Sequence, residues 1–479
     1  MPHTTALIAT LVVYQVVLLG IGFWATRRSR SSSDYYLGGR GLGAWVAALS
    51  ASASSSSAWT LLAVSGAAFT HGVSALWILP ACLGGFLLNW FVVAPRLRRD
   101  SLRTGAITLS EFLAAGHAPR AARRIVVVAS VIVLLSLGTY VASQFQAAGK
   151  TFAEILEVSP TTAVLIGGGI VVLYTFSGGF WAASVTDTLQ GGVMVLACLL
   201  VPGVALYAVG GPDGLADGLT AAGSGFTDWT RGRSGFALLG LVVGTLGIGL
   251  GYPGQPHVVN RFMALRSEAE LRRGAIISIL WALIVYSGML LAGLCGRVLF
   301  GALGDDETVL LRLATDLLPP ALAGVVVAAI LSAIMSTADS QLLVCGSTVS
   351  HDLPARPPQR RALLDRAAVL GISALAIFAA VTVEETIFDT VLFAWSGLGA
   401  AFGPLLLVRL VFGPVPAGWT LAAMLVGFGA TLVWFFSEPW FGYDLKAVVY
   451  ELVPAFLASL VVACLGALAA RRQRLGLPR

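Results

Sequence analysis

The chain has 479 residues, of which 57% are hydrophobic and only 11% are charged, and its mean hydropathy is +0.86. This composition leaves too little polar surface to cover a water-soluble globule of this size, so it excludes a soluble protein and places the chain in a lipid bilayer. The formal charge of +6 does not indicate nucleic-acid binding, because the arginines lie in short loops between apolar stretches.

The apolar stretches predict an all-α polytopic membrane protein with a single domain, 1–479. A spanning helix needs about 20 apolar residues, and stretches of that length recur along the chain. The thirteen predicted spans are 5–25, 44–72, 74–95, 124–148, 161–177, 183–208, 235–260, 274–296, 319–349, 367–383, 386–408, 416–436 and 447–470. We expect the first span to be retained, because it is too long for a signal-peptide core and no small-residue cleavage site follows it.

The basic residues predict the orientation of these spans. When the spans alternate across the membrane, one set of loops holds 24 of the 30 Lys and Arg residues. This set comprises basic residues within 27–40, 96–124, 261–273, 356–366, Arg409 and 471–479. By the positive-inside rule these loops are cytoplasmic, so we expect the N-terminus outside and the C-terminus in the cytoplasm.

Signals for an enzyme, a metal site or a disulfide are weak. The five cysteines have no paired spacing and no neighbouring histidines. The segment 147–151 resembles the end of a phosphate-binding loop, but Gln144 stands where that motif needs glycine. No nucleophile and base occur at a recognisable spacing, so we expect neither an enzyme nor an organic cofactor. Among the histidines only His257 is a site candidate, and a structural role is favoured for it.

The second and seventh predicted spans are interrupted. The second contains Ala48-Leu-Ser-Ala-Ser-Ala-Ser-Ser-Ser-Ser-Ala-Trp59, where lipid-facing residues would be expected. The seventh contains Gly251-Tyr-Pro-Gly-Gln-Pro-His257, whose two prolines remove backbone donors and break a helix. Each begins a block of five spans, 2–6 and 7–11. Inverted-repeat transporters place broken helices at such matching positions, so both are expected to line a central site.

Two acidic residues fall inside predicted spans, Asp187 in the sixth and Asp339 in the ninth. A charge at the bilayer centre costs at least about 2.5–3.5 kcal/mol, so each carboxylate needs a cation, a proton or a polar partner. Ser336, Asp339 and Ser340 share one helix face, and Thr337 lies on its flank. Such hard oxygens can replace the hydration shell of sodium.

Two alternatives to ion binding stay open at this point. A single serine in a span is more often a small residue that permits close helix packing, whereas Ser336, Thr337 and Asp339 together favour an ion site. Asp187 stands near the start of its span, so capping of that helix is as well supported as a functional role.

At these residues the sequence resembles the sodium:solute symporter family, most closely its bacterial sodium/proline symporters. The resemblance runs over nearly the whole chain. The matching motifs are Asp34-Tyr-Tyr-Leu-Gly-Gly-Arg40, Ala48-Leu-Ser-Ala51, Ser177-Gly-Gly-Phe180 with Asp187, Gly251-Tyr-Pro-Gly-Gln-Pro-His257, Arg261-Phe-Met-Ala264 and Met335-Ser-Thr-Ala-Asp-Ser-Gln-Leu-Leu-Val-Cys345. The resemblance implies a leucine-transporter-like core of five plus five inverted repeats at about 44–410. One helix, 5–25, would precede this core and two helices, within 416–470, would follow it.

The resemblance also implies three sets of site residues. The main sodium site would consist of Ala53, Ser56, Ala333, Ser336 and Thr337. A second cation site, which only some family members have, would consist of Asp187, Ser336, Asp339 and Ser340. The substrate contacts of proline symporters correspond to Ser57, Tyr140, Tyr252 and Pro256.

Two positions depart from the proline symporters, because their acid in the serine run is Ser55 here and a tryptophan is Ile248. The first change bears on sodium affinity and the second on the wall of the solute pocket. The resemblance implies a secondary active transporter in the inner membrane of a bacterium, with sodium as the coupling ion. The expected reaction is sodium-coupled symport of a small organic solute, proline or a related amino acid first.

Other functions are weighed against this one. The solute could instead be a carboxylate, a sugar or a vitamin, and the driving ion could be a proton carried by Asp187 or Asp339. A membrane solute sensor is disfavoured because the chain ends at Arg479 without an output domain. The expected partners are sodium, the solute and the lipid bilayer, and no nucleic acid. The sequence leaves the oligomeric state open, a monomer included.

Overall fold

The computed structural model describes residues 2–26, 37–175, 180–354, 361–382 and 385–474, and the regular elements in these ranges are all helices. Parts of two motifs named above, 34–36 and 177–179, lie outside the described residues.

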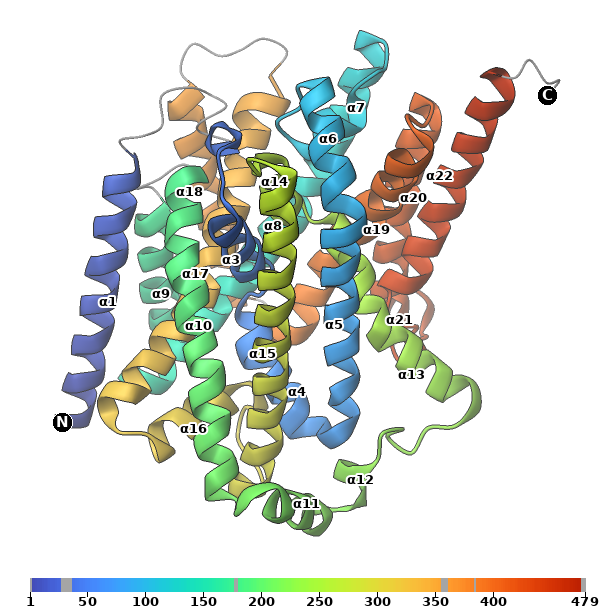
Figure 1. Ribbon diagram of the computed structural model, residues 1–479. Helices are drawn as coiled ribbons and strands as arrows, with labels where there is room; N and C mark the ends of the chain where they lie inside the picture. The colour runs from blue at the N-terminus through green and yellow to red at the C-terminus, as the bar shows by residue number, and fades with distance from the viewer. Residues whose placement is uncertain (1, 27–36, 176–179, 355–360, 383–384, 475–479) are drawn as a thin grey trace.

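The helices of the first half are α1 (Pro2–Thr26), α3 (Ala44–Ser55), α4 (Val64–His71), α5 (Ile78–Leu87), α6 (Ala94–Thr104), α7 (Leu109–Ala114), α8 (Pro119–Leu156), α9 (Pro160–Thr175), α10 (Phe180–Ala208), α11 (Gly211–Ala222) and α12 (Ser224–Thr227). Those of the second half are α13 (Gly235–Gly247), α14 (Pro256–Ala264), α15 (Glu268–Phe300), α16 (Val309–Leu317), α17 (Pro320–Ser347), α18 (Arg361–Thr382), α19 (Ile387–Phe412), α20 (Ala417–Phe435), α21 (Ser437–Phe441) and α22 (Leu452–Arg474). They form one bundle of long helices (Figure 1).

The number of membrane crossings agrees with the predicted thirteen. Ten helices in the described ranges are long and apolar enough to cross a membrane, and Ile8–Ile21 and Pro160–Leu173 are shorter apolar helices. The first of the ten, Trp59–Thr104, contributes to two crossings, because it holds the second half of the crossing that α3 begins, and the chain then turns back between α4 and α5 (Figure 1). The turn is possible because Gly72 has φ 60° and ψ −144°, a conformation open essentially to glycine alone.

The two ends of the described chain lie at opposite ends of the bundle, as an odd number of crossings requires (Figure 1). The short helices α6, α7 and α14 gather at the end where the C-terminus lies, and α11 and α12 lie at the other end. We call these the α7 end and the α11 end.

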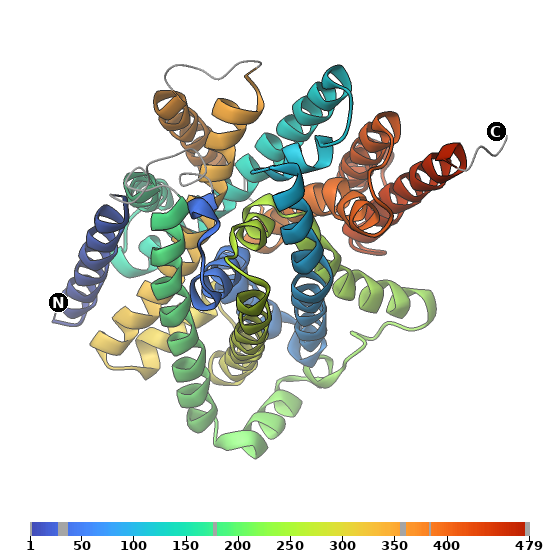
Figure 2. The same ribbon diagram turned by 45° about the horizontal axis from the view of Figure 1, so that its top comes forward.

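The first interrupted span is α3 followed by α4. The helix ends at Ser55, and Ser56 leaves the helical conformation with φ −115° and ψ 78°. The chain then forms a wide π-helical turn, Trp59–Ala63, before α4 continues the crossing. The broken region is central, because α3 packs against α10, α14, α15 and α17 (Figure 2).

The second interrupted span is α13 followed by α14. After α13 the chain tightens into a 3-10 segment, Ile248–Gly254, and becomes extended at Gln255. Glycines let this segment touch its neighbours directly. A Cβ on Gly249 would lie 2.3 Å from the Ala81 carbonyl oxygen, and one on Gly251 would lie 1.9 Å from Nε1 of Trp395. The break therefore lies directly against the backbone of α5 and against the Trp395 ring of α19.

Candidate functional site

A cluster of oxygens joins the broken end of α3 to the middle of α17. The Ser336 and Thr337 hydroxyls donate to the Ala53 carbonyl at 3.2 and 3.4 Å, and Thr337 also reaches the Ser54 carbonyl at 3.2 Å. The Ser336 hydroxyl lies 3.3 Å from the Ala333 carbonyl. All these residues are buried. We call this group of atoms the oxygen cluster.

The spacing of the oxygen cluster suits a small cation. Oxygen ligands lie about 2.3–2.6 Å from an ion the size of Ca²⁺, which is close to that of Na⁺, so ligands at right angles are about 3.3–3.7 Å apart. The hydroxyl and carbonyl oxygens on Ala53, Ser336 and Thr337 lie 3.2–3.4 Å apart. Ser56, the fifth residue expected here, lies at the break, and its hydroxyl is 3.5 Å from that of Tyr286.

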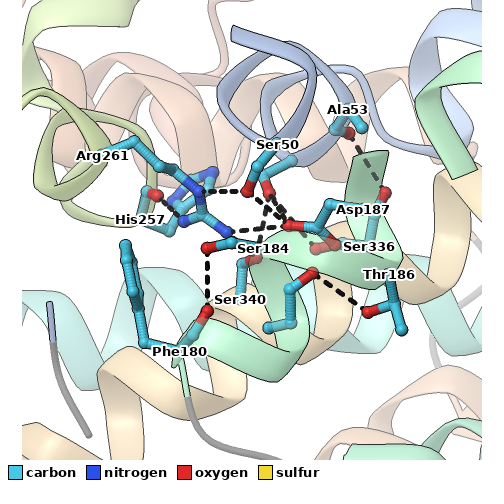
Figure 3. A network of polar contacts seen from close by, with 12 residues as sticks. Ser50, Ala53, Phe180, Ser184, Thr186, Asp187, His257, Arg261, Ser336 and Ser340 are labelled. Atoms are coloured by element: carbon cyan, nitrogen blue, oxygen red, sulfur yellow. Dashed lines mark hydrogen bonds and ion pairs between the residues drawn. The ribbon is translucent and has the colours of Figure 1, made fainter. Parts of the chain in front are cut away.

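A buried ion pair lies beside the oxygen cluster (Figure 3). Oδ2 of Asp187 accepts hydrogen bonds from Ser50 at 2.7 Å, Ser54 at 3.2 Å and the Arg261 guanidinium at 3.0 Å. Arg261 also donates to the Ser50 hydroxyl at 2.9 Å, to the Ser340 hydroxyl and to a backbone carbonyl of its own helix. The two charged side chains are 0% and 2% exposed, so each depends on the other and on these hydroxyls.

The position of Arg261 corrects the sequence analysis, which counted it with the cytoplasmic loop residues. The predicted seventh span stopped at residue 260, whereas α14 continues to Ala264 and turns Arg261 toward Asp187. The helical spacing gives the signal that was missed, because Arg261 lies one turn after His257 and so faces the same side. Asp187 has charged and hydroxyl partners rather than a cap at a helix end.

Three of the four residues expected at the second cation site meet around the Ser54 hydroxyl. That hydroxyl lies 3.2 Å from Asp187, 2.9 Å from the Ser340 hydroxyl and 3.4 Å from the Ser336 carbonyl. Asp339 lies on α17 with Ser336 and Ser340, but its Oδ1 is buried without a hydrogen-bond partner among the described residues. Ser50 and Ser54, which complete the cluster, belong to the serine run and were not singled out from the sequence.

A small cavity lies beside both helix breaks. It has about 240 Å³ of empty space and is lined by Ser55, Trp59, Tyr140, Ile248, Tyr252, Tyr286, Val391, Leu392 and Trp395. We call it the aromatic cavity.

The four expected substrate residues are placed differently. Tyr140 and Tyr252 line the aromatic cavity. Ser57 does not line it, but accepts a hydrogen bond from the Tyr140 hydroxyl at 3.2 Å. Pro256 is also absent from the lining and begins α14.

Aromatic side chains that the sequence analysis did not single out complete the cavity. Nε1 of Trp395 donates to the Ile248 carbonyl at 3.0 Å, and its ring stands edge-on to Tyr252 with centroids 4.7 Å apart. A flat ring from α19 therefore covers the wall beside Ile248.

Hydroxyl groups connect the aromatic cavity to the break in α3. The hydroxyls of Tyr252 and Tyr286 are 3.0 Å apart, and Tyr286 lies 3.3 Å from the Thr60 hydroxyl and 3.5 Å from that of Ser56. Tyr286, on α15, therefore touches both sides of the broken region.

Two further cavities lead from this centre toward opposite ends of the bundle. One has about 920 Å³ of empty space, shares Ile248 and Leu392 with the aromatic cavity and reaches His71 at the end of α4. The other has about 400 Å³, is lined by Arg261 and Ser340, and extends to the segment just before α7. We call the second one the α7-side cavity.

Comparison with known proteins assigns the fold and the class of function. The model of the sodium:solute symporter family matches residues 35–427. The chain belongs to this family. It is 34% identical to the osmoregulated proline transporter OpuE of Bacillus subtilis (strain 168), over 97% of this chain and 95% of the relative. It is also 34% identical to the sodium/proline symporter of Escherichia coli (strain K12), over 95% and 92% of the two chains.

A solved structure supports the same fold. A Na⁺-coupled sialic acid symporter, in a substrate-bound outward-open state, superposes with a TM-score of 0.79 and covers 97% of this chain and 98% of its own, at 20% identity. The predicted resemblance and fold class are thus confirmed. The protein is a membrane transporter, a sodium-coupled symporter of a small solute, and not an enzyme.

Proposed function

We propose that this symporter couples the entry of sodium to the uptake of proline or a closely related amino acid. The observation that carries the proposal is a pairing of two sites. An oxygen cluster with the spacing of a cation shell lies next to a cavity of about 240 Å³ lined by aromatic rings and a few hydroxyls. The two relatives named above are transporters of proline, and they match over more than nine-tenths of the chain.

In this proposal sodium binds to Ala53, Ser56, Ala333, Ser336 and Thr337. The Ser336 and Thr337 hydroxyls now donate hydrogen bonds to the Ala53 carbonyl. When sodium binds, these hydroxyls would rotate so that their oxygens face the ion. Bound sodium would tie α3 to α17 and so favour the arrangement in which the broken helices enclose the solute. Tyr140 and Tyr252 would contact the solute directly, whereas Ser57 and Pro256 would shape the wall from behind.

The proposed second cation site, Asp187, Ser336, Asp339 and Ser340, already receives a positive charge from Arg261. The guanidinium already neutralises the Asp187 carboxylate, which it contacts through Oδ2. We therefore infer that one sodium accompanies each solute while this ion pair is intact.

The proposed arrangement in the membrane follows from charge. The end of the bundle that carries the arginine-rich helix α6 would face the cytoplasm, with the C-terminus, and the N-terminus would lie outside. The repeat core would comprise about 44–410 and the last two crossings would be 416–470. The bilayer would be that of the bacterial inner membrane.

The test is uptake of labelled proline into proteoliposomes that contain the purified protein. An inward sodium gradient is compared with an equal potassium gradient. We expect accumulation with sodium only, and competition by unlabelled proline. Sodium-driven uptake of another solute, with none of proline, would refute the substrate. Uptake that ignores sodium and stops with a protonophore would refute the coupling ion.

A further inference from the structure

The segment before α7 covers the α7-side cavity. Ile107 and Thr108 line that cavity together with Arg261 and Ser340 of the buried cluster. An ion that left the cluster through this cavity would therefore pass the segment. What holds it in place decides how readily the cavity opens.

Three side chains fasten this segment to the end of α17. Glu111 lies on α7, and His351 and Asp352 lie in the π-helical turn Thr348–Asp352 that follows α17. Nε2 of His351 is 2.7 Å from Oε1 of Glu111, and the Thr108 hydroxyl donates to Oδ1 of Asp352 at 3.1 Å. One ligand atom from each of the three residues lies within 4.8 Å of the other two.

We propose that Glu111, His351 and Asp352 form a binding site for a divalent transition metal, Zn²⁺ above all, that fastens α7 to the end of α17. An imidazole nitrogen and two carboxylate oxygens are established ligands of zinc, and three protein ligands leave a fourth position for water. The combination of imidazole with carboxylates favours zinc over magnesium or calcium, which prefer oxygen ligands alone.

The present spacing is close to what a bound ion requires. Ligands at about 2.0–2.2 Å from a tetrahedral ion lie about 3.3–3.6 Å apart. The 2.7 Å contact between His351 and Glu111 would therefore open by less than about 1 Å as zinc replaces the hydrogen bond. Asp352 is buried and would turn its carboxylate toward the same point.

The surroundings hold the ligands in position. The other Glu111 oxygen accepts the Ile107 N–H at 3.0 Å, so the carboxylate is fixed to the cavity-lining segment itself. Arg123 on α8 donates to the backbone carbonyls of Asp352, at 2.7 Å, and Leu353. It therefore orients the turn through the backbone, and the Asp352 carboxylate would exchange its hydrogen bond from Thr108 for the ion. Supporting hydrogen bonds of this kind commonly contribute ten- to a hundredfold to metal affinity.

A metal at this site acts as a latch. It would hold the segment 107–111 against α17 and slow the opening of the α7-side cavity, so zinc on that side of the membrane reduces turnover. Only this effect on transport rests on the proposed function, because binding of the ion needs no solute.

Binding is tested on the full-length protein in detergent, with any histidine tag removed and bound metals stripped by a chelator. Zn²⁺ is titrated in competition with a chromophoric chelator. We expect one Zn²⁺ per chain, with affinity lowered at least tenfold in His351→Ala and in Glu111→Gln. Glu111→Gln keeps an acceptor for the Ile107 N–H, so it preserves the local fold. His117→Ala, a histidine just beyond α7 and outside the cluster, is the matched control and keeps full affinity.

Either of two binding results would overturn the site. One is the absence of binding at one equivalent in the wild type, and the other is equal affinity in the wild type and both cluster variants. The latch is tested separately in vesicles with Zn²⁺ or a chelator sealed on the α7 side. Zn²⁺ should slow sodium-driven uptake at least twofold in the wild type and leave the rate of His351→Ala unaffected. Equal slowing in both would overturn the latch, and the binding result stands even if proline is not the solute.

Discussion

The oxygen cluster and the aromatic cavity both adjoin the break after α3, yet they are built in different ways. The oxygen cluster uses short side chains and backbone carbonyls of two helices, α3 and α17, at spacings of 3.2–3.4 Å. The aromatic cavity uses large rings from separate helices, among them Tyr140, Tyr252 and Trp395. An ion is selected by fixed oxygen spacing, whereas a solute is selected by shape, and each part of the molecule has the residues for its own task.

The largest expected effect is on the ion pair that supports the oxygen cluster. Arg261→Met leaves Asp187 as an uncompensated buried charge, which typically costs about 3–5 kcal/mol. We expect a large drop in the thermal stability of the purified protein. The double variant with Asp187→Asn should recover most of it, because no lone charge remains. Equal stability of the single and double variants would show that the two residues do not depend on each other.

The next largest effect should separate ion binding from solute binding. Ser336→Ala and Thr337→Ala each remove an oxygen from the oxygen cluster. The sodium concentration for half-maximal uptake should rise at least about tenfold, which corresponds to about 1.4 kcal/mol. Ser347→Ala on the same helix is the control, since its hydroxyl donates to the Val344 carbonyl of its own helix at 2.8 Å and lies outside the oxygen cluster. Unchanged sodium dependence in both cluster variants would remove these residues from the ion site.

A smaller effect is expected where the two regions meet. Tyr286→Phe removes the hydroxyl that touches Tyr252 on one side and Ser56 and Thr60 on the other. Sodium and solute each strengthen the binding of the other by the same factor, which we call the coupling factor. In Tyr286→Phe the coupling factor should fall about three- to tenfold, because one hydrogen bond contributes about 0.5–1.5 kcal/mol. Equilibrium binding of solute at low and high sodium measures it. An undiminished factor would mean that the coupling runs elsewhere.

The smallest effect is expected at Ser55, where proline symporters are expected to carry an acid. Ser55 is among the residues that line the aromatic cavity, but its hydroxyl donates to the Ser52 carbonyl of its own helix at 3.0 Å. Ser55→Ala should therefore change sodium and solute affinity by about 0.5 kcal/mol or less, roughly twofold. A tenfold loss of sodium affinity in an uptake assay would extend the ion site to this residue.

The same contrast explains what the sequence could predict. Both helix breaks were predictable, because proline, glycine and a run of serines act locally on the helix. The resemblance placed the oxygen cluster on two groups of residues, each close together in the sequence. A helix keeps such neighbouring residues close together in space. Arg261 was misplaced because a charged residue at the end of a predicted span looks like a loop residue, and only the tertiary fold turns it inward.

The aromatic cavity was only partly predictable. Trp59, Tyr286 and Trp395 come from helices far apart in the chain, and nothing local distinguishes them from the many aromatic residues of an apolar bundle. Asp339 was expected to share a helix face with Ser336 and Ser340. The Ser54 hydroxyl contacts both of these residues, whereas Oδ1 of Asp339 has no hydrogen-bond partner among the described residues. Proximity along one helix predicts a common face, but not a common partner.

The direct contacts of the 3-10 segment have a consequence for mutational tolerance. A Cβ at position 249 or 251 would meet backbone or ring atoms at 2.3 and 1.9 Å, closer than van der Waals contact allows. Neighbouring position 248, in contrast, carries a side chain that faces a cavity. In a random library selected for uptake, 249 and 251 should remain glycine while 248 accepts many residues. The residue that lines the solute cavity can therefore change quickly in evolution, whereas the glycines that form the helix break cannot.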